Sequence, residues 1–108
     1  MSYDLRAAIA TAVSTVAGVK CYALKPTVRT QSGDAWVKWN GNARVAPGAV
    51  ETSWQVIVLL PQDDRAGDEW RAAREWALID ALDSVVHVDG MEPGSIDDSP
   101  ALLINCRE

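Results

Sequence analysis

The segment Thr52–Leu60 constrains the fold most, because it reads as a β-strand with apolar side chains on both faces. Trp54, Val56, Val58 and Leu60 fall on one face, and Gln55, Ile57 and Leu59 fall on the other. Apolar residues on both faces are typical of a central strand that is covered on both sides, or of a strand with one face left for a partner. Pro61 closes the strand, since proline cannot donate a backbone hydrogen bond to a neighbouring strand.

Two helices are expected, one before and one after this strand. The first spans Leu5–Val16 with a single apolar stripe, and Gly18 follows it as the left-handed residue that ends such helices. The second begins at Asp63 or Asp64, either of which can cap it, and runs to about Ser84.

The second helix is apolar on two sides. Its main stripe contains Trp70, Ala73, Ala77, Leu78, Ala81 and Val85, and its second group contains Ala72, Trp76 and Ile79. A helix that packs on a sheet needs only one stripe. The second group therefore indicates a helix enclosed within the fold or a helix that contacts another chain, and the short chain favours the second interpretation.

Four further strands and three loops complete the pattern. Strands are expected at Val19–Leu24, Ala35–Asn40, Val86–Val88 and Ala101–Cys106, and loops at Pro26–Asp34, Asn40–Gly48 and Asp89–Pro100. The 108 residues fit one domain, residues 1–108. Because helices and strands do not alternate regularly, the sequence predicts an α+β fold. We expect a mostly antiparallel sheet of four to five strands with two helices packed on it, in the order α-β-β-β-α-β-β.

The charge balance argues against a protein that grips nucleic acid. The sequence has ten basic and fifteen acidic residues, which gives a net charge of −5. Proteins that bind phosphate backbones do so through clustered Lys and Arg. Arg65, Arg71 and Arg74 do cluster on the second helix, but the surrounding carboxylates favour salt bridges along the helix. The sequence has no apolar run long enough to cross a membrane and no basic, apolar leader, so neither a membrane helix nor export is expected.

Catalytic motifs are absent from the sequence. His87 is the one histidine, and a triad with Ser84 or Ser53 and an aspartate would require contacts that no nucleophile-elbow motif supports. We therefore interpret His87 as a polar residue on the exposed face of a strand. The sequence predicts no enzyme, no catalytic residue and no cofactor.

Carboxylate pairs at Asp63-Asp64 and Asp97-Asp98 raise the question of a metal site. The first pair is better interpreted as a helix cap. The loop Asp89–Pro100 has enough carboxylates to hold a weak calcium ion, but it lacks the ligand spacing and central glycine of an EF-hand. A flexible acidic loop and no metal is the favoured interpretation.

The two cysteines, Cys21 and Cys106, have apolar neighbours on predicted strands. They are expected to be small buried residues in the reduced form, and a disulfide would require the two strands to be adjacent.

Tryptophan usage is the unusual feature, with five tryptophans and no phenylalanine. Trp36 and Trp39 are three apart on one strand and so point to opposite faces, which means that both cannot join one core. Trp76, with Ile79, lies off the main stripe of its helix. Tryptophan is enriched in interfaces, although some tryptophans are only half-buried on a surface. Trp36, Trp39, Trp76 and Ile79 are therefore the predicted subunit-interface residues.

The chain resembles the tail terminator proteins of long-tailed bacteriophages over most of its length. The resemblance rests on the Ala-rich opening helix that ends in Ala17-Gly18-Val19, the short strand closed by Pro26, the strand Trp54–Val58 ending at Pro61, and Ala81-Leu82 in the second helix before a short strand. It implies a homohexameric ring that caps the tail tube and joins it to the head–tail connector protein during virion assembly. DNA would pass through the ring without specific binding. The protein would assemble in the host cytoplasm and reside in the tail or neck of the virion.

Three other functions stay open. Another small head–tail connector or completion protein would share the size and the element order. An acidic binding module would form a salt-sensitive complex with a basic partner. A small hydrolase or isomerase would lose its activity when His87 is replaced.

Overall fold

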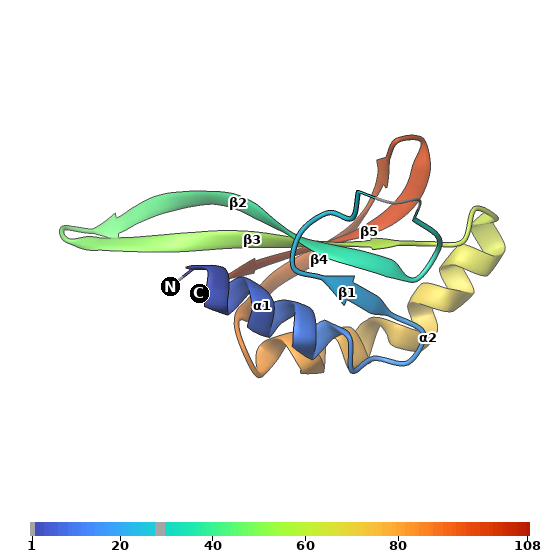
Figure 1. The fold of residues 1–108 in the computed structure, drawn as a ribbon, viewed down its shortest axis with the longest axis horizontal. Helices are drawn as coiled ribbons and strands as arrows, with labels where there is room; N and C mark the ends of the chain where they lie inside the picture. The colour runs from blue at the N-terminus through green and yellow to red at the C-terminus, as the bar shows by residue number, and fades with distance from the viewer. Residues whose placement is uncertain (1, 28–29) are drawn as a thin grey trace.

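A five-stranded sheet with the strand order β1-β2-β3-β5-β4 organises the structure, a computed structural model that describes residues 2–27 and 30–108 (Figure 1). The elements are α1 (Ser2–Val13), β1 (Lys20–Tyr22), β2 (Asp34–Ala46), β3 (Ala49–Leu59), α2 (Asp64–Asp83), β4 (His87–Ile96) and β5 (Ser99–Arg107). Only β1 and β2 pair in parallel, and the other three strand pairs are antiparallel. The predicted α+β class, element order and mostly antiparallel sheet are confirmed.

Both helices cover one face of the sheet (Figure 1). The residues that form this core come from α1, α2 and the inner strands, and the largest of those that are fully buried are Ile9, Val13, Trp54, Val56, Val58, Leu78, Leu82, Leu102 and Ile104. Trp54, Val56 and Val58 alternate along β3 and share one face, as predicted, and the structure shows that this face points to the helices. This layer supplies most of the apolar area that the fold removes from water.

The opposite face of the sheet holds a second, smaller cluster. It consists of Trp36, Ile57, Leu59 and Ala101, with Tyr22, Ile96 and Leu103 partly buried beside them. The prediction that β3 is apolar on both faces is confirmed, and the chain itself covers both. Trp36 is only 4% exposed, and the Lys25 ammonium lies 5.5 Å from the centre of its ring.

The β2–β3 hairpin is longer than predicted. A loop was expected at Asn40–Gly48, but β2 continues to Ala46 and the chain turns only at Pro47-Gly48. The prediction was wrong because the register shifts between Trp39 and Asn42, which is a β-bulge, and Gly41 takes a φ of 109° there. Asn-Gly is favoured in tight turns, but a glycine with positive φ also serves a bulge inside a continuing strand.

The expected loop Asp89–Pro100 was also wrong, since most of it is strand. β4 and β5 form a hairpin whose turn is Asp97-Asp98, and both residues have positive φ, 51° and 66°. Two consecutive positive φ angles fit the tight hairpin turns that Asp tolerates. Pro93 is compatible with a strand here because β4 is at the edge of the sheet. Of the expected loop Pro26–Asp34, residues 28 and 29 lie outside the described residues.

Arg74 joins the two helices at the end of α1. Its Nε donates a hydrogen bond to the carbonyl of Ala17 at 2.8 Å, and its guanidinium lies 4.3 Å from the centre of the Trp70 ring. Gly18 has the predicted left-handed backbone, with a φ of 83°, but α1 ends at Val13 and not at Val16, so Gly18 lies in the turn after the helix. Arg74 thus links α2 to the turn that follows α1.

Arg6 joins α1 to the sheet. Its Nη1 donates to the carbonyls of Ala23 and Val37, at 3.1 and 3.0 Å, and its guanidinium lies 5.2 Å from the centre of the Trp54 ring. One side chain thus satisfies backbone carbonyls of two segments and packs against the largest core residue.

We predict that Arg6→Ala lowers the free energy of unfolding by about 2–3 kcal/mol, because it removes two charge-assisted hydrogen bonds and the contact with Trp54. Arg65→Ala is the matched control, since Arg65 is exposed and forms one ion pair with Glu69 along α2, so a change below about 0.5 kcal/mol is expected. Urea unfolding followed by tryptophan fluorescence measures both. Equal losses in the two variants would contradict the role given to Arg6.

Candidate functional site

The β2–β3 hairpin projects beyond the rest of the sheet (Figure 1). β1 pairs with β2 only at residues 34–36, and β5 pairs with β3 only at residues 53–59. Residues 38–51, here called the arm, therefore pair only within the β2–β3 hairpin and have no third strand beside them among the described residues. The arm contributes to the elongated shape of the molecule, which measures 47 × 28 × 23 Å.

The arm presents apolar and basic side chains to water. Trp39 is 52% exposed, and Val45 and Val50 are each 59% exposed. Lys38 and Arg44 are exposed as well. Long exposed strand edges that carry apolar residues tend to pair with other chains, so the arm is a candidate contact surface.

The outer face of α2 is the second exposed apolar surface. Trp76 is 70% exposed, more than any other large apolar residue among those described, and Ile79 is half-buried. Ala72, Ala73 and Ala77 are exposed beside them.

The prediction that Ala73 and Ala77 belong to the core stripe was wrong. Of the other stripe residues, Leu78 is fully buried and Trp70, Ala81 and Val85 pack against the core, and Leu82, which was not in the predicted stripe, is fully buried as well. The helix orients its leucines to the sheet because they carry far more apolar area than alanines.

The structure places the four predicted interface residues in different environments. Trp39 lies on the arm and Trp76 on the outer face of α2, and both are exposed. Ile79 is half-buried beside Trp76. Trp36 packs into the smaller cluster of its own chain, so we correct its assignment: it offers little surface to a partner. The physical reason is that the face of the sheet opposite the helices has its own apolar cluster, which the sequence pattern alone did not place.

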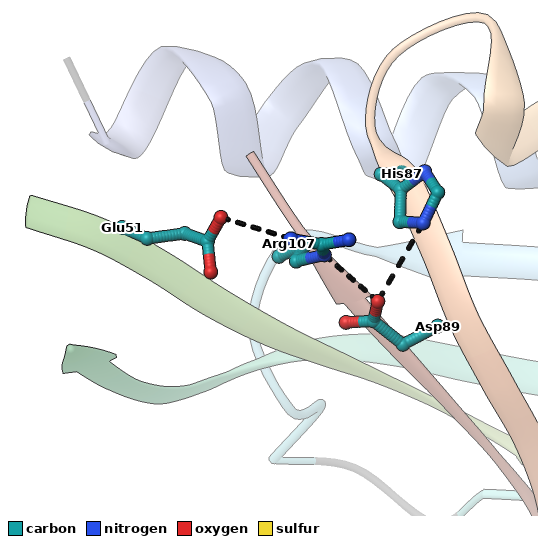
Figure 2. Close-up of polar contacts among 4 residues, drawn as sticks. All are labelled: Glu51, His87, Asp89 and Arg107. Atoms are coloured by element: carbon teal, nitrogen blue, oxygen red, sulfur yellow. Dashed lines mark hydrogen bonds and ion pairs between the residues drawn. The ribbon is translucent and has the colours of Figure 1, made fainter. Parts of the chain in front are cut away.

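A polar cluster ties the base of the arm to the body of the sheet (Figure 2). Arg107 on β5 donates from Nη1 to Glu51 Oε2 at 3.2 Å and from Nε to Asp89 Oδ1 at 2.8 Å. The hydrogen bond to Asp89 and the charge of that carboxylate raise the pKa of the Arg107 guanidinium, with a smaller contribution from Glu51. Arg107 thus holds β3, β4 and β5 together where the arm leaves the sheet.

His87 contacts the same cluster but lacks the geometry of a triad. Its Nε2 lies 3.7 Å from Asp89 Oδ1, too far for a hydrogen bond, and its side chain is 61% exposed. The Ser84 hydroxyl, one of the two candidate nucleophiles, donates instead to the carbonyl of Ala81 at 2.7 Å and so closes α2. The geometry favours the interpretation of His87 as an exposed polar residue on a strand.

The carboxylate pairs have structural roles. Asp63 caps α2, since its Oδ2 accepts a hydrogen bond from the Ala66 amide at 2.9 Å. Asp97 and Asp98 form the turn between β4 and β5. Within residues 2–27 and 30–108, no group of three or more His, Cys, Asp or Glu side chains is arranged to hold a metal ion.

Sequence reasoning missed an open groove of about 510 Å³ between α2 and the β4–β5 edge. Asp64, Asp68, Arg71 and Glu75 line it from α2, at a spacing that places them on one face of the helix. Arg71 forms ion pairs with Asp68 and Glu75, as the sequence predicted for this helix. The acidic spacing was visible in the sequence, but nothing there showed that β4 would extend beside it.

The two cysteines are free and far apart in the sheet. Two strands separate β1 from β5, so Cys21 and Cys106 are roughly 14 Å apart at ~4.8 Å per strand, beyond the Cα separation of about 7 Å that a disulfide allows. Burial is the main cause that raises the pKa of each thiol to about 12.

We predict that the free energy of unfolding falls as the pH rises from about 9 to about 12. The unfolded chain releases its thiol protons near their ordinary pKa of 9.0, whereas the folded chain keeps them until about 12, so alkaline pH favours unfolding. Cys106→Ala should reduce the slope of stability against pH in urea titrations. An unchanged slope would mean that the Cys106 thiol titrates alike in both states.

No helix among the described residues is both long and apolar enough to span a membrane. No known family model matches the chain, and no curated protein is significantly similar to it.

Proposed function

We propose that the protein is a structural assembly subunit that forms a ring of identical copies and acts as the tail terminator of a long-tailed bacteriophage. The observation that carries the proposal is the pair of unpartnered apolar surfaces, the arm and the outer face of α2. A chain that keeps Trp39 and Trp76 exposed on separate elements has more apolar surface than packing of a lone subunit explains.

Two different exposed apolar surfaces on one subunit, the arm and the outer face of α2, favour a ring over a two-fold dimer. A two-fold interface joins one surface to the same surface of a second copy. An interface between different surfaces repeats head to tail and closes into a ring when the rotation allows it. The hexameric state, the tail tube protein and the head–tail connector as partners follow from the family resemblance.

The charge of the chain suits a ring through which DNA moves. At −5 per copy, a hexamer would carry about −30, which repels phosphate at the wall of a channel. Such a ring would let DNA pass without binding it specifically. A virion location, in the tail or neck, belongs to the same proposal.

A second candidate is an acidic binding module for a basic partner. The carboxylates of α2 along the groove favour it. This candidate predicts a stable monomer that binds one basic protein and releases it as salt concentration rises. Another head–tail connector protein would form a ring like the terminator, and only binding to tail tubes separates the two.

Native mass spectrometry and negative-stain electron microscopy of the purified protein test the ring. We expect a closed oligomer that binds one end of purified tail tubes and stops their growth. A protein that stays monomeric at every concentration and leaves tube length unchanged would refute the proposal. A ring that binds connectors but not tubes would favour the other head–tail proteins.

We predict that Trp39→Ala and Trp76→Ala weaken assembly at least tenfold, because exposed tryptophans commonly carry interface energy. Their melting temperatures should change little, since neither side chain is in a core, and alanine suits the helix at position 76. Thr11→Ala is the control, as Thr11 is an exposed residue of α1, an element that carries neither surface. Sedimentation velocity gives the assembly constants, and a loss of folding stability equal to the loss of assembly would place these tryptophans in the core of the subunit.

A further inference from the structure

The groove beside α2 has an apolar floor and an acidic wall. Met91 and Pro93 of β4, Leu102 of β5 and Leu60, just after β3, line it with apolar atoms. The opposite wall is α2, with its line of carboxylates. A groove of about 510 Å³ is large enough for several side chains of a partner.

The charges on the α2 wall are unbalanced. Asp64, Asp68 and Glu75 share the wall with Arg71 alone. Arg71 is paired with Asp68 and Glu75, while the Asp68 side chain is still 73% exposed. The wall therefore favours an occupant that brings a cation and an apolar side chain together.

The arm carries such a combination on one of its faces. Arg44 pairs directly with Val50 across the hairpin, so both side chains project from the same face. Glu51 is next in the chain and points to the opposite face, where it binds Arg107. The Arg44–Val50 face thus has a guanidinium, an exposed apolar side chain and no carboxylate from residues 38–50.

The arm of a chain cannot reach its own groove. The tip of the arm and the N-terminal end of α2, which lines the groove, lie at opposite ends of the longest axis of the molecule (Figure 1). That axis is 47 Å long. Any contact between the two must join different copies.

We propose that the groove of one copy holds the Arg44–Val50 face of the arm of a second copy. Arg44 meets the carboxylates of α2, and Val50 packs on the apolar floor. The contact is heterologous, because each copy offers an arm to one neighbour and a groove to the other. This inference rests on the proposed ring and names the surfaces that close it.

A charge exchange tests the contact. We expect Arg44→Glu alone and Asp68→Lys alone each to weaken self-association at least tenfold, and the double variant to return to within about threefold of the wild type. Lys20→Glu is the matched control: it makes the same charge change on an exposed residue of β1, outside both surfaces, and should associate like the wild type. Sedimentation velocity measures association, and circular dichroism establishes that each variant is folded.

A mixture of the two single variants sharpens the test. In an equal mixture every arm can find a groove of opposite charge, so we expect mixed oligomers in native mass spectra although neither variant assembles alone. Normal assembly by both single variants, or folded variants that fail to assemble in the mixture, would overturn the contact between arm and groove. The outer face of α2 would then be the remaining candidate for the interface between subunits of the ring. Wild-type protein that stays monomeric and binds a basic protein through the groove would overturn both the contact and the ring.

Discussion

The pairing of β2 with β3 is the interaction on which the rest of the structure depends. Its inner part sits between the two apolar clusters, so Trp54 and Val56 face the helices while Ile57 faces Trp36. Its outer part runs past β1 and β5, and no third strand among the described residues pairs with it. One ladder thus builds the core and also exposes the arm, and any change that shortens it would affect both.

Two arginine side chains stabilise the β2–β3 pair where the neighbouring strands β1 and β5 end. β1 has only three residues, yet Arg6 binds the carbonyl of Ala23 just beyond it and that of Val37 on β2. Arg107 binds Glu51 at the point where the arm leaves β5. Partly buried arginines serve these places because a planar guanidinium can satisfy several acceptors at once.

Periodicity in the sequence predicted the elements that are buried and failed where strands are exposed. The alternation of apolar residues in β3 and the helix cap at Asp63 could be predicted from the sequence, because each depends on local residue types. The outer halves of β2 and β4 contain Gly41, Pro93 and other turn-forming residues, which bulges and a sheet edge accommodate. The groove could not be predicted either, because its far wall is formed by the part of β4 that was expected to be a loop.

The burial of Trp36 and the exposure of Trp76 show why tryptophans alone do not define a surface. Both were predicted interface residues, but residues distant in the sequence cover only Trp36. Charge distinguishes the arm from the groove more clearly than apolar residues do. A net charge of −5 repels copies at random orientations, whereas the basic face of the arm and the carboxylates of α2 attract. In the proposed contact between arm and groove, these charges would favour association in one orientation and oppose it in most others, as a closed assembly requires of a subunit with exposed strand edges.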